Sequence, residues 1–186
     1  MSWHKGRMAR RRRRRGTGST QAADWRITPA QLLARLAPGQ KLIGLDVGEK
    51  TIGVAVSDAL LMSATPRHTL RRAKFSADAE ALCALAREEQ AAAFVIGHPL
   101  HMSGADSPRA QAARAFARNL SAACGLPVVL WDERLSTAAA ERAMLQADLS
   151  RARRAKAVDK LAAAWILQGL LDHLRTLRDA QNEPDT

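Results

Sequence analysis

The chain has 186 residues, 47% of them hydrophobic, and a formal net charge of +11. This length suits one domain with enough apolar residues for a buried core, and the charge favours a polyanionic partner such as nucleic acid. The apolar runs are shorter than the roughly 20 residues of a membrane span, and no secretory signal follows the basic start. We therefore expect no membrane partner and a cytoplasmic location.

The first 24 residues are rich in arginine and then in glycine, serine and threonine, which predicts a disordered tail. Lys5, Arg7 and the run Arg10–Arg15 give eight cations before the first acid. Such a run can neutralise phosphates without reading a sequence. A solvated tail with no task, or a translation start at Met8 instead of Met1, explains the run equally well.

A short helix is predicted after the tail, because Thr28-Pro29 suits a helix start and Pro38-Gly39 a helix end. Residues 25–40 would then be an N-terminal appendage. Residues 41–47 and 51–57 are apolar runs separated by Gly48-Glu49-Lys50, the pattern of a β-hairpin. A third strand is expected near residues 68–72.

The later elements alternate between helices and strands, with a 3.6-residue apolar period in the helices and short apolar runs in the strands. They are a helix at 76–90, a strand at 93–97, a helix at 108–124, a strand at 128–131, a helix at 136–147, a basic linker at 151–154 and a helix at 155–177. Cys83 and Cys124 lie far apart in two of these helices, and we expect two separate buried thiols.

This order predicts an α/β fold with a mixed five-stranded sheet flanked by helices. The main domain would span residues 41–178, followed by a C-terminal tail at 179–186. In such sheets the active site lies beyond the carboxyl ends of the parallel strands. The segments to inspect are those after Asp46, Gly97 and Trp131.

Asp46 ends a strand that the sheet should bury on both faces, so its carboxylate needs a partner. One interpretation is a turn-capping aspartate that accepts backbone N–H groups near Gly48. The other is a binding residue, because Gly48 and Gly53 would let a phosphate or its metal approach the backbone. The Asp-x-Gly pattern alone does not decide between them.

Two further carboxylates lie at converging positions. Successive side chains of a strand point to opposite faces, so only one of Asp132 and Glu133 can share the face of Asp46, and periodicity does not say which. A salt bridge to Arg134 is the structural alternative for this pair. Asp159 is the only acid inside the broad apolar arc of the last helix, where a pairing with a neighbouring lysine or arginine is the alternative.

Three converging carboxylates would repel one another unless a hard cation binds them. The pattern therefore predicts a Mg²⁺ or Mn²⁺ site, at which a metal-activated water could attack a phosphodiester. A zinc site at His98 and His101 is not supported, because no cysteine cluster accompanies them.

Three ordered segments resemble a known family. They are Gly44–Asp58 (GLDVGEKTIGVAVSD), Trp131–Thr137 (WDERLST) and Val158–Ala163 (VDKLAA). Together they resemble the bacterial Holliday-junction-resolvase-like family, YqgF, also described as pre-16S rRNA nucleases, over about residues 41–175. His98 departs from the Gly-Leu-Pro pattern of the family, so the resemblance assigns it no role.

The resemblance implies a ribonuclease-H-like fold and metal-dependent hydrolysis of phosphodiester bonds in structured nucleic acid. It gives Asp46, Glu133 and Asp159 the catalytic and metal-binding roles, with Asp132 as the second candidate beside Glu133. The candidate substrate contacts are Lys50, His101 and Arg134.

The favoured function is endonucleolytic processing of the 5′ end of pre-16S rRNA in ribosome biogenesis. The alternatives are a Holliday-junction resolvase in DNA recombination and repair, and a non-catalytic RNA-binding factor in ribosome maturation. The sequence does not choose RNA over DNA, or a monomer over a homodimer. A sugar-kinase-type ATPase also has Asp-x-Gly after a strand, but this chain lacks the second phosphate loop that such enzymes need.

Overall fold

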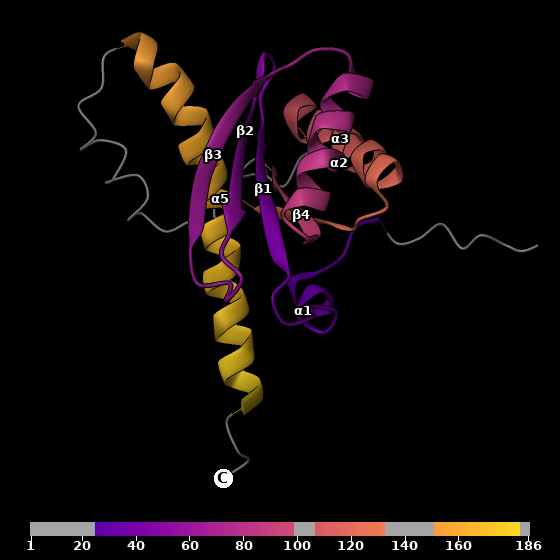
Figure 1. Cartoon of the computed structure of the whole chain (residues 1–186), viewed down its shortest axis with the longest axis vertical. Coiled ribbons are helices and arrows are strands. Elements are labelled where there is room, and N and C mark those ends of the chain that lie inside the picture. The colour runs from indigo at the N-terminus through magenta and orange to yellow at the C-terminus, as the bar shows by residue number, and fades with distance from the viewer. Residues whose placement is uncertain (1–24, 99–106, 133–150, 183–186) are drawn as a thin grey trace, which may run out of the picture.

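A five-stranded sheet with the strand order β3-β2-β1-β4-β5 forms the centre of the computed structural model (Figure 1). The structure describes residues 25–98, 107–132 and 151–182, and in the last segment the side chains from Leu161 onward. The strands are β1 (Lys41–Val47), β2 (Thr51–Ser57), β3 (Ala64–Arg71), β4 (Ala91–His98) and β5 (Val128–Asp132). β2 is antiparallel to β1 and β3, whereas β4 and β5 run parallel to β1.

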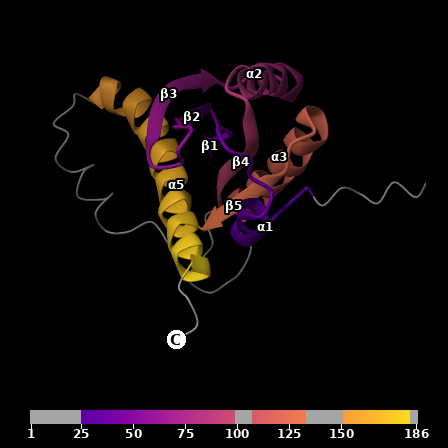
Figure 2. The same ribbon diagram turned by 60° about the horizontal axis from the view of Figure 1, so that its bottom comes forward.

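Helices cover both faces of this sheet. The described helices are α1 (Pro29–Leu33), α2 (Phe75–Glu88), α3 (Pro108–Cys124) and α5 (Arg151–Asn182). Helices α2 and α3 lie on one face and the long helix α5 on the other (Figure 2). None of the described helices is long and apolar enough to cross a membrane. The predicted α/β architecture, a mixed sheet flanked by helices, is confirmed.

Four predicted boundaries are wrong. α5 ends at Asn182, beyond the predicted helix end at residue 177 and inside the predicted C-terminal tail. β3 begins at Ala64, earlier than expected, and α1 ends at Leu33, well before Pro38. The predicted linker at 151–154 is the first turn of α5, because arginine and alanine are strong helix formers and a run of positive charge does not by itself end a helix. The predicted helix at 136–147 lies outside the described residues.

The side chains of β1 alternate between two cores. Ile43 and Leu45 pack under α2 and α3, whereas Leu42 packs under α5. Gly44 also faces α5, and a Cβ built on it would lie 2.7 Å from both the carbonyl oxygen of Ala163 and the Cβ of Leu167. Helix α5 can therefore approach β1 this closely only because residue 44 has no side chain.

The two cysteines are joined across the outer helices. Cys83 in α2 and Cys124 at the end of α3 form a disulfide with a Cα–Cα distance of 5.2 Å, within the usual range for such bonds. The prediction of two separate thiols is wrong, although Cys83 is buried as expected. Their separation of 41 positions in the sequence concealed that α2 and α3 are neighbours on the same face of the sheet.

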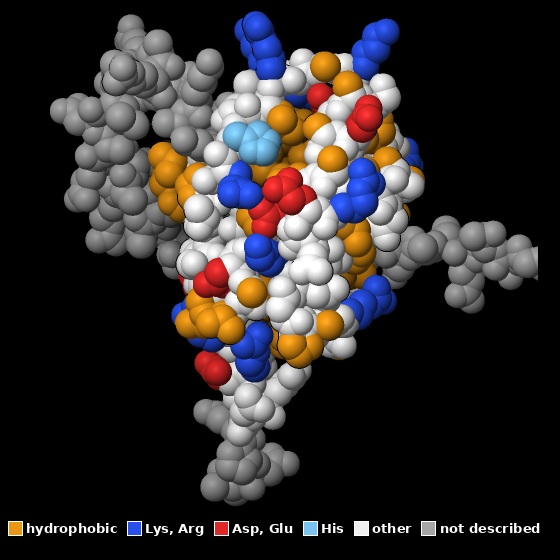
Figure 3. Space-filling model, viewed as in Figure 1, with side chains coloured by type: hydrophobic (Ala, Val, Ile, Leu, Met, Phe, Trp, Pro, Cys, Tyr) orange, Lys and Arg blue, Asp and Glu red, His pale blue; other side chains and the backbone are white. Residues whose placement is uncertain are grey.

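A buried carboxylate ties α2 to the sheet at the end opposite the β1–β2 turn. Glu89, only 8% exposed, accepts a hydrogen bond from Lys41 Nζ at 2.7 Å and pairs with Arg67. Arg67 can reach it because of a bulge: His68 pairs with Val54 and Pro66 with Ala55, so Arg67 is an extra residue on β3. The space-filling view shows acidic and basic side chains next to one another in the middle of this face (Figure 3).

Protonation of Glu89 should destabilise the fold in acid. The hydrogen bond from Lys41 and the nearby Arg67 charge hold the pKa of this carboxyl below its usual range despite burial. A depressed folded pKa adds stability above the unfolded pKa, and that stability is lost as the pH falls through the folded value. Glu89→Gln should therefore lower the free energy of unfolding at pH 7. The expected loss is about 1–3 kcal/mol, less than for a fully buried ion pair, because water partly screens the exposed basic partners.

The measurement is urea unfolding from pH 7 down to pH 3, and the matched control is Glu88→Gln at the exposed neighbouring position. Glu89→Gln should show a flatter acid decline than the parent chain, and Glu88→Gln the parent's slope. Equal slopes for all three proteins would contradict a stabilising role for the Glu89 carboxylate.

Candidate active site

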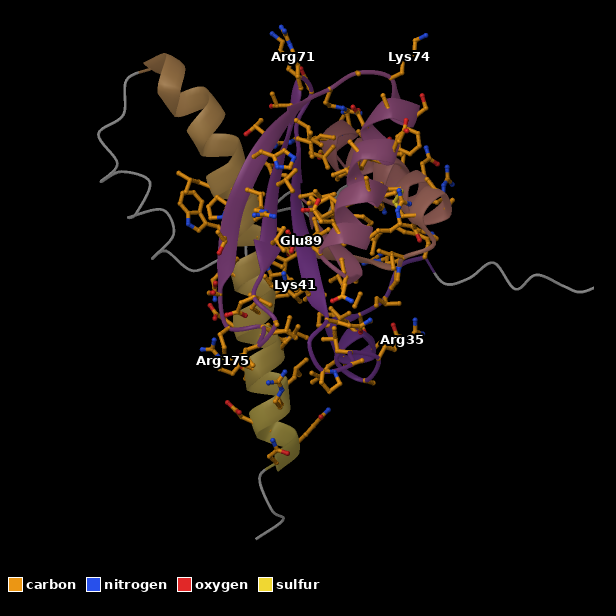
Figure 4. All side chains as sticks on the ribbon, in the orientation of Figure 1. Arg35, Lys41, Arg71, Lys74, Glu89 and Arg175 are labelled. Carbon is orange, nitrogen blue, oxygen red and sulfur yellow. A yellow bond between two sulfur atoms is a disulfide. The ribbon has the colours of Figure 1, made fainter. Side chains whose placement is uncertain are left out.

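One edge of the sheet gathers the carboxyl ends of four strands. β1, β4 and β5 are parallel, and β3 runs in the same direction because both β1 and β3 are antiparallel to β2. Arg71 and Lys74 mark this edge in Figure 4, whereas Lys41 and Glu89 lie farther down the sheet. Helices α2 and α3 begin at the same edge, immediately after their preceding strands and loops. Basic side chains project from it in the space-filling view (Figure 3).

Asp46 is the next-to-last residue of β1, the central strand. Its backbone is paired with Gly53 of β2, and cross-strand neighbours lie on the same face of the sheet. The Asp46 side chain is 17% exposed, and its Oδ1 lies 3.8 Å from Nη2 of Arg109. The structure thus holds a largely buried carboxylate at the edge where the sequence predicted it.

Gly48 is explained by the hairpin turn itself. Its N–H donates to the carbonyl oxygen of Thr51 at 2.9 Å. A Cβ at residue 48 would lie 3.1 Å from that same oxygen, closer than side chains normally come. The sequence interpretation, in which Gly48 leaves room for a phosphate or metal, is therefore not needed to account for this glycine.

The strand faces separate Asp132 from Asp46. Asp46 follows Leu42 and Gly44 at intervals of two residues and so shares their face, the one covered by α5. On β5, Trp131 belongs to the core under α5, and its ring centroid lies 5.6 Å from that of His173 on this helix. Asp132 is next in the strand and therefore points to the face of α2 and α3.

The other predicted site residues are placed less completely. Lys50 is exposed in the β1–β2 turn. Asp159 lies within α5, but its side chain is outside the described part, and Glu133, Arg134 and His101 lie outside the described residues altogether. Among the described side chains, no group of three histidines, cysteines or acids is arranged to hold a metal ion.

Sequence reasoning missed two arginines at this edge. Arg109 occupies the first turn of α3, which starts where Ser107 accepts a hydrogen bond from the Ala110 N–H at 3.0 Å. Arg72 follows β3 directly. A signal for Arg72 was available, because a third strand antiparallel to the second strand of the hairpin runs toward the same edge of the sheet as the strand of Asp46.

Arg72 is fixed from three sides. Its Nη1 donates to the carbonyl oxygen of Gly48 at 3.0 Å, and its Nε lies 3.7 Å from Oδ2 of Asp78. Its guanidinium carbon lies 5.5 Å from the ring centroid of Phe116, a cation–π distance. Asp78 is itself held, because it accepts the N–H of Ala73 at 3.1 Å. A rigid positive charge therefore stands beside the turn that follows Asp46.

Comparison with known proteins identifies the family. Residues 40–173 match the family described as RuvX, Holliday junction resolvase. The chain belongs to this family. The RuvX match covers the whole sheet and most of α5, so the edge described above is part of the family domain.

Curated RuvX relatives include a protein of Rhizobium meliloti, 52% identical over 131 residues, which cover 70% of this chain and 79% of the relative. A protein of Rhodobacter capsulatus is 60% identical over 122 residues, which cover 66% of this chain and 77% of the relative. Both carry the name "Putative pre-16S rRNA nuclease". Among solved structures, RuvC of Thermus thermophilus in complex with a Holliday junction substrate aligns with a TM-score of 0.45 at 13% identity, over 75% of this chain and 96% of the other.

Proposed function

We propose that this RuvX-family nuclease is a metal-dependent endonuclease that processes the 5′ end of pre-16S rRNA, with Asp46, Glu133 and Asp159 as its catalytic carboxylates. The observation that carries the proposal is the largely buried Asp46 carboxylate at the edge where parallel strands end. The names of the relatives at 52% and 60% identity support the rRNA substrate. Ribosome maturation would place the protein in the cytoplasm.

Strand alternation supports Glu133 over Asp132 as the second carboxylate. Trp131 lies on the α5 face, which is also the face of Asp46, so an extended chain would return to that face at residue 133. One strand, β4, separates β1 from β5. Two strand spacings amount to about 10 Å between the backbones, a span that two acidic side chains can bridge through a shared ion.

Helix packing supports Asp159 as the third carboxylate. Ala163 of α5 lies over Gly44, and residue 159 precedes it by one helical turn, or about 6 Å along the axis. Asp46 lies two residues beyond Gly44, or about 7 Å along the strand. α5 runs antiparallel to β1, because Gln168 later in the helix contacts Ala64 and Met62 at the opposite end of the sheet. The two acidic positions therefore lie at similar heights.

These three carboxylates are suitable ligands for Mg²⁺ or Mn²⁺, hard cations that prefer oxygen donors. Asp46 can supply one of these ligands, because its largely buried carboxylate lies at the carboxyl end of the central strand. When bound, such ions activate a water and stabilise the charge that develops on the leaving oxygen. The protein side chains would orient the scissile phosphate, and the basic edge would attract the polyanion.

Cleavage of defined substrates tests this proposal. The full chain is incubated with a labelled RNA that spans the 5′ leader of bacterial pre-16S rRNA and with a four-way DNA junction, each with Mg²⁺, Mn²⁺ or EDTA. We expect metal-dependent cuts in the leader RNA that EDTA abolishes. Cutting of the junction alone would replace rRNA processing with junction resolution, the activity in the family description. If neither the leader RNA nor the junction is cut, the nuclease proposal is refuted.

A further inference from the structure

An open groove begins at the same edge and runs along α3. It has a volume of about 690 Å³, and its walls include Gly48, Arg72, Phe75, Arg109, Ala112 and Phe116. The groove lies on the α2/α3 side of the sheet, whereas Asp46 points to the α5 side. The two meet at the strand edge, because Arg109 both lines the groove and lies 3.8 Å from the Asp46 carboxylate.

The charges of the groove suit a phosphate. Arg72 is held by Gly48, Asp78 and Phe116, so its charge is positioned before any ligand arrives. Arg109 is 62% exposed and can adjust to a bound group. Glu49 is an acid on the same wall but is exposed at the turn, where water screens it. An anionic ligand would therefore find one fixed and one adjustable arginine.

The rest of the groove suits a planar, largely apolar group. Phe75 is partly exposed and meets Phe116 edge to face, with ring centroids 5.7 Å apart. Ala112 is exposed on α3 and contributes a small apolar wall. A volume of about 690 Å³ falls within the roughly 300–1,000 Å³ range of pockets for small organic molecules, the size class of a nucleotide. A duplex cannot enter such a groove with its bases stacked, whereas an unpaired base can leave the strand and pack on aromatic side chains.

We propose that this groove, which we call the α3 groove, binds one nucleotide of a single-stranded segment of the substrate next to the cleavage site. Its phosphate lies between Arg72 and Arg109, and its base packs against Phe75 and Ala112. The inference rests on the proposed nuclease function and adds a substrate requirement, namely unpaired nucleotides beside the scissile bond.

Binding measurements separate the groove from catalysis. Fluorescence anisotropy is recorded in EDTA with the Asp46→Asn chain, using a labelled single-stranded RNA from the pre-16S leader and a blunt duplex of the same sequence. Ala112→Glu in this background introduces bulk and negative charge into the α3 groove. The same change at Ala122, an exposed alanine of α3 outside the groove, is the matched control.

We expect Ala112→Glu to weaken single-strand binding by about tenfold, since the stacking of one base on an apolar wall is worth about that factor. Duplex binding should change little, and Ala122→Glu should leave both unchanged. Arg109→Ala should also weaken single-strand binding, with Arg118→Ala, an exposed arginine of α3, as its control. Replacing the nucleotide beside the cut with an abasic residue should weaken binding to the Asp46→Asn parent but not to Ala112→Glu.

The proposed nucleotide binding in the α3 groove is contradicted if Ala112→Glu and Ala122→Glu bind the single strand equally well. It is also contradicted if Ala112→Glu weakens single-strand and duplex binding by the same factor. This outcome is independent of cleavage by the unmodified chain. If the unmodified chain cuts RNA but Ala112→Glu does not weaken single-strand binding, the nuclease proposal stands and the groove proposal fails. If the chain does not cut but Ala112→Glu weakens single-strand binding specifically, the groove still binds a nucleotide and the nuclease proposal fails.

Discussion

Asp46→Asn should slow substrate cleavage at least a hundredfold while leaving the fold intact. The amide keeps the size of the carboxylate but loses the negative charge that a hard cation requires. Removing even an outer partner of a metal ligand typically costs about 10–100-fold in metal affinity or activity, and loss of a ligand should cost at least as much. The measurement is the single-turnover cleavage rate on the leader RNA across a Mg²⁺ titration.

The stability of this variant should rise or stay level. Asp46 is 17% exposed and is proposed to share a metal site with two other acids, so neutralising it should remove repulsion between like charges. Asp179→Asn, at an exposed position near the end of α5, is the matched control and should cut as the parent does. Parent-like cleavage by Asp46→Asn would remove Asp46 from the metal site and leave it as a turn residue.

The fold was predictable because its signals are local. Two apolar runs separated by Gly48-Glu49-Lys50 predicted β1 and β2, and Ser107-Pro108 located the start of α3 at the residue where the structure has it. The start of β3 was missed because Pro66 and the bulge at Arg67 interrupt the two-residue pattern. The first turn of α5 was missed because its arginines resemble a solvated linker in sequence, although they also suit a helix.

The candidate site was predictable only in part, because its geometry depends on pairs that are distant in sequence. The sequence identified Asp46 but could not choose between Asp132 and Glu133. The contact of Trp131 with His173 on α5 shows the face of Trp131, so Asp132 lies on the opposite face of the sheet from Asp46. Asp159 was identified from the apolar arc of its helix, and its role stays a prediction, as does that of Glu133.

The contacts of the arginines and the disulfide likewise depend on the tertiary structure. Arg109 meets Asp46 from a helix that begins more than sixty residues later, and no spacing rule connects the two. Cys83 and Cys124 are likewise brought together only when α2 and α3 pack side by side. Sequence patterns predict the elements, whereas the contacts between distant elements depend on how these pack in three dimensions.

Gly44→Ala should reduce both stability and cleavage, through the position of α5. The new methyl group would lie 2.7 Å from the carbonyl oxygen of Ala163 and from the Cβ of Leu167, and neither is the end of a flexible side chain. The helix must move away, at a cost of about 1–3 kcal/mol in the free energy of unfolding. Because α5 also carries Asp159, the same displacement should misplace the proposed third carboxylate.

The cleavage rate of Gly44→Ala should therefore fall by more than the loss of folded protein explains, when it is measured well below the midpoint of thermal unfolding. Gly125→Ala provides the comparison, because Gly125 has φ +71° with no atom within 4 Å of an added Cβ. Its substitution should cost about 1–2 kcal/mol of backbone strain without moving α5. If both variants lose similar stability but only Gly44→Ala loses cleavage, the contact between β1 and α5 sets the active geometry. If Gly44→Ala cuts as fast as Gly125→Ala, α5 does not carry a catalytic carboxylate over β1, and the assignment of Asp159 fails.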